Sequence, residues 1–151
     1  MKTYEIEQCV ARYYNPRVNL IVPNVSWGLF LHECDLLVCT KAGYLHEIEI
    51  KISLSDLKAD KKKAHQHLSK KIKCLYFAIP ENLEPHIEHI PERAGILLVR
   101  DKWRLTKIRE AQRNPYAGAV DIGTRYRMAW LGCMRIWQWR EQIEKIKEVD
   151  K

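Results

Sequence analysis

The residues from Tyr44 to Ser53 constrain the fold most, because apolar and polar side chains alternate along them without a break. One set of alternate positions holds Ile48, Ile50 and Ile52, and the other holds Glu47, Glu49, Lys51 and Ser53. Successive side chains of a β-strand point to opposite faces of its sheet. This segment is therefore predicted to be a strand with an apolar face and a charged face.

A β-hairpin is predicted to include this strand and the residues directly before it. Residues 33–40 have the composition of a strand, and Lys41-Ala42-Gly43 provides a three-residue loop. The glycine suits the left-handed position that follows a type I turn in such a loop. With this loop, Thr40 lies opposite Tyr44, which fixes the register of the two strands.

Charged side chains meet across the predicted hairpin. Counting back from the loop places Asp35 opposite Glu49, and Glu33 opposite Lys51, on one face. Two covered carboxylates repel each other, and a divalent cation offsets this repulsion. Hard oxygen donors without a histidine or cysteine beside them suit Mg²⁺ or Mn²⁺. A magnesium site is one interpretation; a solvated polar face, with Lys51 in a salt bridge to Glu33, is the other.

Helical spacing and strand composition predict the remaining elements. Helices are expected over residues 3–14, 57–71, 102–111 and 125–149, and strands over 18–22, 74–79 and 95–99, with 25–31 continuing the first strand beyond a bend. Ser53 provides N-cap chemistry for the second helix. A strand followed by a crossover helix and another strand is expected to be covered on both faces. The fold class is therefore α/β, with a mixed central sheet.

The length of 151 residues suits a single domain. We expect a core of order α-β-β-β-α-β over about residues 1–101 and a helical extension over about 102–151. No stretch approaches the roughly 20 apolar residues that span a bilayer, and the polar N-terminus does not resemble a secretory signal. A cytoplasmic protein with no membrane partner is expected.

The cysteines and histidines give no sign of a zinc site. Five cysteines are scattered among apolar residues without a CxxC spacing, which predicts reduced and mostly buried thiols. His65 and His67 lack the i,i+4 spacing of a helical metal site. No zinc is expected from these patterns.

Positive charge is clustered along the chain. The net charge is +7; residues 58–73 hold seven lysines and one aspartate, and residues 125–140 hold four arginines and no acid. Clustered positive charge is what a surface that follows phosphates needs. A nucleic-acid partner is expected, with phosphate contacts from Lys61, Lys62, Lys63, Lys70 and Lys71.

Two sets of residues resemble known nucleases. Asp35, followed on the next strand by Glu49-Ile50-Lys51 and then by a helix, resembles the signature of the PD-(D/E)XK superfamily, whose fold is restriction endonuclease-like. A longer stretch also resembles the MmcB-like DNA-repair branch: Val22-Pro23-Asn24-Val25-Ser26-Trp27-Gly28, His32-Glu33-Cys34-Asp35-Leu36 and Glu49-Ile50-Lys51-Ile52-Ser53-Leu54-Ser55-Asp56-Leu57. The resemblance covers about residues 1–101. Cys34 stands where the superfamily signature has proline, which leaves the acidic ligand in place.

The resemblance implies an Mg²⁺-dependent nuclease that cleaves nucleic acid, with DNA favoured, in a repair, recombination or phage-related role. It implies that Asp35, Glu49 and the backbone carbonyl of Ile50 bind Mg²⁺ or Mn²⁺, and that Lys51 acts with them in catalysis. Residues expected to support these groups are Glu33, Glu47, Ser53 and Asp56, and Glu33 and Glu47 are alternatively ligands of a second metal. Asp56, Asp60, Lys63 and His67 fall near one helical stripe, which either lines the site or faces solvent.

The last predicted helix is rich in large apolar residues. It carries Met128, Trp130, Leu131, Met134, Ile136, Trp137 and Trp139 within twelve residues. Core packing is the favoured interpretation, followed by a homodimer interface and then by base stacking. Two other functions therefore stay open: a nucleic-acid-binding protein of the same fold that does not cleave, and an interaction subunit that uses this helix.

Overall fold

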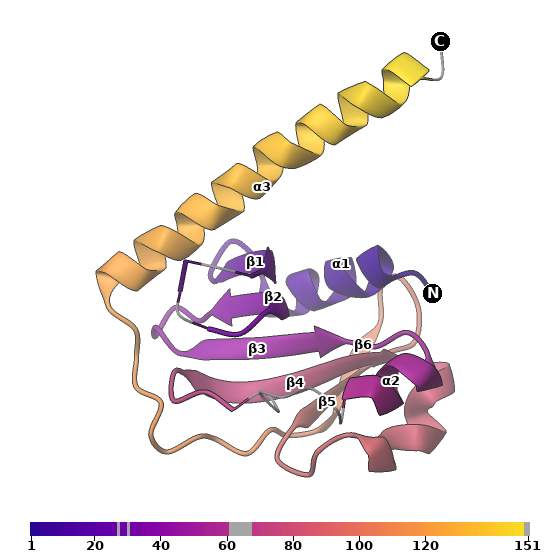
Figure 1. Ribbon diagram of the computed structural model, residues 1–151. Helices are drawn as coiled ribbons and strands as arrows, with labels where there is room; N and C mark the ends of the chain where they lie inside the picture. Colours follow the sequence, from indigo (N-terminus) through magenta and orange to yellow (C-terminus); the bar gives the residue numbers. More distant parts are fainter. Residues whose placement is uncertain (27, 30, 61–67, 150–151) are drawn as a thin grey trace.

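A six-stranded sheet with its strands side by side in chain order forms the centre of the computed structural model (Figure 1). The structure describes residues 1–26, 28–29, 31–60 and 68–149. The strands are β1 (Leu20–Val25), β2 (Cys34–Cys39), β3 (Leu45–Ile50), β4 (Ile72–Pro80), β5 (Gly95–Val99) and β6 (Leu105–Arg109). The pairs β3–β4 and β4–β5 are parallel and the other pairs are antiparallel. This mixed sheet, with helices on both sides, confirms the α/β class.

Helices cover both faces of the sheet. Helix α1 (Thr3–Tyr14) packs Ile6, Cys9 and Val10 into the cluster that contains the inward-facing residues Ile48 and Ile50. On the opposite face, α2 (Leu54–Asp60) and the 3₁₀ segment η1 (Glu81–His89) cover β4 and β5. Helix α3 (Ile122–Val149) covers β1 and β2 on the same face. Strand β3 is third in the sheet and is therefore buried on both sides, as its place in the predicted order indicated.

The β2–β3 hairpin has the register that the loop predicted. Thr40 donates its backbone N–H to the carbonyl of Tyr44 at 2.9 Å, and the observed pairs run from Cys39–Leu45 to Leu36–Ile48. Gly43 adopts φ of +90°, the left-handed conformation that favours glycine. The three-residue loop alone thus sets the alignment of the strands that carry the polar row.

Residues 102–111, predicted as a helix, contain the strand β6 instead, so this prediction is wrong. The cause is a turn in front of the strand: Asp101 Oδ1 accepts the backbone N–H groups of Trp103 at 2.8 Å and Arg104 at 2.9 Å. Such an aspartate turn reverses the chain, and pairing along β5 then outweighs the helix propensity of the segment. The sheet therefore extends beyond residue 101.

Three smaller expectations also differ from the structure. The predicted helix over 57–71 is observed as α2 up to Asp60, and residues 68–71 are not helical, whereas 61–67 lie outside the described residues. Strand β1 continues through Pro23, which an edge strand tolerates, and ends at Val25. Ile52, expected with the other isoleucines in the core, is 40% exposed because the strand ends at Ile50.

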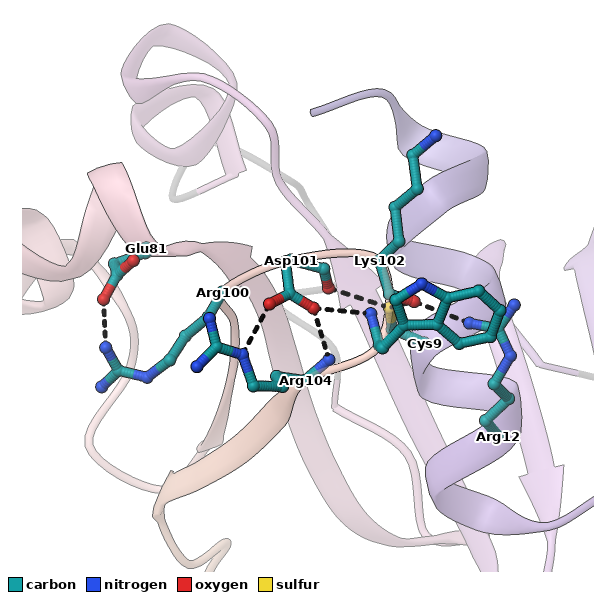
Figure 2. A network of polar contacts seen from close by, with 8 residues as sticks. Cys9, Arg12, Glu81, Arg100, Asp101, Lys102 and Arg104 are labelled. Carbon is teal, nitrogen blue, oxygen red and sulfur yellow. Dashed lines mark hydrogen bonds and ion pairs between the residues drawn. The ribbon is translucent and has the colours of Figure 1, made fainter.

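A polar network fixes the position of α1 against the β5–β6 turn, as Figure 2 shows. The Cys9 thiol and the Arg12 guanidinium both donate to the carbonyl oxygen of Lys102, at 3.0 and 2.7 Å. The Arg12 guanidinium also lies 4.2 Å from the ring centre of Trp103. Helix α1 is thereby attached at the sheet end where β3, β4 and β5 finish.

Helix α3 is only partly packed on the sheet. Met128 and Leu131 are buried against β1 and β2, but the helix then continues past the sheet (Figure 1). Trp137 and Trp139 are 65% and 45% exposed, so core packing is wrong as an explanation for them.

None of the described helices is long and apolar enough to cross a membrane. None of the five cysteines forms a disulfide, and all except Cys133 are buried, as predicted.

Candidate active site

The polar row of β3 lies on the sheet face opposite α1 and is buried. Glu47 and Glu49 have no exposed surface, and Lys51 directly after the strand is 4% exposed. On one side of the row is the apolar cluster under α3, and on the other side is the cluster under α2 and η1. The row therefore separates two apolar clusters, and its charges are removed from water.

The ammonium group of Lys51 lies between two buried carboxylates. Its Nζ is 2.9 Å from Glu49 Oε2 and 2.9 Å from Oδ1 of Asp60, at the end of α2. Burial acts to lower the pKa of Lys51, but the charges and hydrogen bonds of Glu49 and Asp60 outweigh it and raise the pKa above its ordinary value. Lys51 therefore stays a fixed cation at the end of β3.

Asp35 reaches the same end of β3 from β2. Its Oδ2 accepts the backbone N–H of Ile50 at 2.8 Å, just beyond the last observed pair of the β2–β3 ladder. In a regular antiparallel ladder a backbone carbonyl of the neighbouring strand would accept such an N–H. Burial raises the pKa of Glu7 on α1, and the charge of Asp35 adds to this rise. The Asp35 carboxylate thus lies where the ladder ends, within electrostatic reach of α1.

The other residues expected around the site have separate roles. Glu33 is exposed, so the predicted salt bridge between Glu33 and Lys51 is wrong, because Lys51 pairs with Glu49 and Asp60. Ser53 Oγ accepts the backbone N–H of Asp56 at 3.2 Å, as expected for the N-cap of α2. Ser53 and Asp56 therefore hold the first turn of α2, which in turn brings Asp60 to Lys51.

Glu47 lies beside a histidine and a cysteine, contrary to the expectation that oxygen donors alone line this face. Nε2 of His32 is 2.7 Å from Oε1 of Glu47, and the Cys34 thiol donates to the carbonyl of His32 at 3.3 Å. The sequence did not identify His32 as a residue of this site, because it lies in an irregular segment before β2, where hydrophobic periodicity does not indicate which way a side chain points. For Asp60 the sequence provided a partial indication, because its spacing from Asp56 places both residues near one stripe of the predicted helix.

The lysines expected to contact phosphates are only partly described. Lys61, Lys62 and Lys63 lie outside the described residues. Lys71 donates to the carbonyl of Leu29 at 2.9 Å, and Lys70 is exposed. Lys70 borders a groove of about 550 Å³ whose other basic lining residues are Lys73, Arg93 and Arg113. This groove lies at the start of β4 and β5, the opposite end of the sheet from Lys51.

The fold and the site together define an α/β protein with a cluster of buried charges at the end of a central strand: Lys51 lies between two carboxylates, and a third carboxylate lies at the end of the hairpin. The family model of the DNA repair protein MmcB-like matches residues 5–142. The chain therefore belongs to the MmcB-like family, as its motifs predicted.

The fold also occurs in a solved structure. A protein of unknown function from Silicibacter pomeroyi superposes with a TM-score of 0.68 at 16% sequence identity, covering 97% of this chain and 94% of that one. At this identity the likeness concerns the fold alone. No curated protein matches the sequence.

Proposed function

We propose that this protein is a metal-dependent nuclease of the PD-(D/E)XK type that cleaves DNA in repair or recombination. One observation carries the proposal: the Asp35 carboxylate accepts the backbone N–H of Ile50, the residue that stands between Glu49 and the buried Lys51 in the sequence. The name of its family, DNA repair protein MmcB-like, supports DNA as the substrate. The acidic pair, the adjacent carbonyl and the lysine match the signature in kind and in order.

The donor set fits Mg²⁺ or Mn²⁺. Asp35 and Glu49 offer carboxylate oxygens, which these hard cations prefer. The N–H and C=O of an extended residue point to the same side of its strand. Because the N–H of Ile50 points to Asp35, its carbonyl is a suitable third ligand. Asp35, Glu49, Asp60 and Lys51 together carry a formal charge of −2, which a divalent cation would neutralise.

Each side chain has a defined part in the proposed reaction. The bound cation would activate a water molecule and offset the negative charge that develops on the phosphodiester. Lys51 places a positive charge next to Glu49, where it stabilises a phosphate oxygen or orients the attacking water. Asp60 holds the Lys51 ammonium in position.

An end-labelled panel of substrates tests the proposal. Single-stranded, duplex, flap and junction DNA, with matching RNA, are incubated with Mg²⁺, Mn²⁺ or chelator. We expect cleavage with Mg²⁺ or Mn²⁺, none with chelator, and none in Asp35→Asn. Glu88→Gln is the matched control, because Glu88 is an exposed carboxylate on η1. Binding without cleavage under every condition would favour the DNA-binding alternative and contradict the nuclease proposal.

The exposed part of α3 supports a second role, in which this helix pairs with another copy of the chain. Ile136, Trp137 and Ile143 are each at least half exposed along the part that continues past the sheet. Exposed apolar side chains gathered on one element are typical of an interface. Sedimentation should give a dimer for the native chain and a monomer for the variant Trp137→Ala with Ile143→Lys. A native monomer at all concentrations contradicts this role.

A further inference from the structure

We propose a transition-metal site formed by His32, Cys34 and Glu47. Each side chain offers one donor atom, an imidazole nitrogen, a thiol sulfur and a carboxylate oxygen, and these atoms all lie within 4.8 Å of one another. Cys34 and Glu47 are fully buried, and the His32 side chain is 10% exposed. The cluster therefore has a defined shape and a narrow approach from solvent.

Two neighbouring segments supply the three donors. Cys34 is the first residue of β2, His32 precedes it by two positions, and Glu47 lies in the middle of β3. Contacts inside the group already hold it together: His32 Nε2 is 2.7 Å from Glu47 Oε1, and the Cys34 thiol donates to the His32 carbonyl. A cation here would join the start of β2 to the centre of β3.

The donor set selects a zinc-like cation rather than magnesium. Thiolate and imidazole are ligands of Zn²⁺ and other transition metals, carboxylate oxygen also binds Zn²⁺, and open zinc sites have three protein ligands with water in the fourth position. Zinc lies about 2.0–2.3 Å from such ligands, so binding would move His32 Nε2 and Glu47 Oε1, now 2.7 Å apart, slightly away from each other to admit the ion between them. The thiolate and carboxylate charges balance the dication, which reduces the cost of burying it.

Binding has a defined proton balance. Cys34 releases its thiol proton to solvent when the sulfur–metal bond forms. A neutral His32 donates its Nε2 proton to Glu47 Oε1 in the metal-free state; on binding, Nε2 gives this proton to solvent, Nδ1 takes one from solvent, and the lone pair of Nε2 binds the metal, so the imidazole stays neutral and the hydrogen bond to Glu47 is replaced by two bonds to the metal. One proton is released for each cation bound at a pH where the imidazole is neutral.

This site is distinct from the proposed nuclease site. Glu47 and Glu49 are two residues apart in one strand, a separation of about 7 Å. The nuclease site has oxygen donors from Asp35 and Glu49, whereas this site needs the sulfur of Cys34. A spectroscopic signal from sulfur coordination therefore reports on one site and is silent about the other.

Cobalt(II) tests the proposal without any activity measurement. The full-length protein is reduced, treated with chelator, desalted, and titrated with Co²⁺. We expect a near-ultraviolet sulfur-to-cobalt charge-transfer band and the visible bands of tetrahedral cobalt, which saturate at one equivalent and disappear when Zn²⁺ is added. The band should be absent in Cys34→Ser and Cys34→Ala, and Co²⁺ affinity should fall at least tenfold in His32→Gln and in Glu47→Gln.

Matched variants separate this site from other thiols and from the nuclease site. Cys39→Ser removes another buried thiol of β2, and Cys133→Ser removes the exposed one. Both should keep the full band, as should Asp35→Asn and Glu49→Gln. Near-ultraviolet circular dichroism checks that each variant is folded. No band in the native protein, or a band that persists in folded Cys34→Ser and Cys34→Ala, overturns the proposal.

Discussion

Beneath α1 the sheet buries one continuous apolar cluster, whereas the opposite face carries two clusters separated by the row of Glu47, Glu49 and Lys51. Ile48 and Glu49 are adjacent in β3 and equally inaccessible to water, yet they belong to different faces. Burial of apolar surface stabilises the fold, while burial of charge is costly unless each charge is compensated. The comparison indicates that the face under α1 is stabilised by apolar burial, whereas the opposite face holds buried charges that must be compensated.

The largest expected effect separates these two roles within one strand. Glu49→Gln should lower DNA cleavage by about 1000-fold, because several kcal/mol of metal-derived stabilisation are lost at 1.36 kcal/mol per tenfold. Ile48→Ala should instead lower the free energy of unfolding by about 2–5 kcal/mol and leave cleavage per folded molecule unchanged. Urea unfolding and single-turnover kinetics measure the two quantities. Equal kinetic losses in both variants would contradict the division between the faces.

The next effect concerns the charge balance of the polar face. Lys51→Met should lower the free energy of unfolding by about 3–5 kcal/mol, because Glu49 and Asp60 lose the ammonium that they share. Lys58→Met, at an exposed position of α2, should change it by less than about 0.5 kcal/mol. Adding Asp60→Leu to Lys51→Met should recover part of the loss. A double variant less stable than Lys51→Met would argue against this explanation.

The face under α1 should give a pH effect of its own. Burial lowers the pKa of His46 to about 4, and its Nδ1 lies 3.1 Å from the Tyr14 hydroxyl. The unfolded chain binds this proton near pH 6.5 and the folded chain only near pH 4, so stability should fall as pH falls through this window. The full loss is roughly 3 kcal/mol at 1.36 kcal/mol per pKa unit.

Two histidine variants check this assignment by urea unfolding between pH 7 and pH 4. His46→Gln should flatten the pH dependence of the free energy of unfolding, whereas His86→Gln, on η1, should leave it as in the native protein. If His46→Gln retains the native slope, another group is responsible for the pH dependence.

The smallest expected effect tests which lysines contact DNA. Replacing Lys61, Lys62 and Lys63, which follow α2 in the chain, with alanine should flatten the slope of log affinity against log salt by roughly two to three units, at about 0.9 per duplex phosphate contact. Lys102→Ala, on the turn that holds α1, should leave the slope unchanged. An unchanged slope in the triple variant, with a change in Lys102→Ala, would reverse the assignment.

Local features of the sequence were sufficient to predict the hairpin and its polar row. The loop 41–43 set the register, and strict alternation identified the buried charged face of β3. Contacts between distant elements could not be predicted in this way: Asp60 meets Lys51 only because α2 folds back over β3. His32 lies near Glu47 because an irregular segment leads into β2. Helix propensity misled the prediction for 102–111, where one aspartate turn decided the outcome.

The three-residue loop at Gly43 also has a consequence for how the site assembles over time. Hairpins form in about 1–10 μs, whereas parallel pairing between distant segments is slower. Asp35 can therefore reach the backbone of Ile50 early in folding, before β4 and β5 join the sheet. A one-residue slip of the register that this loop sets would turn every side chain of β2 to the other face relative to β3. The register that this turn sets thus decides whether Asp35 reaches the backbone of Ile50.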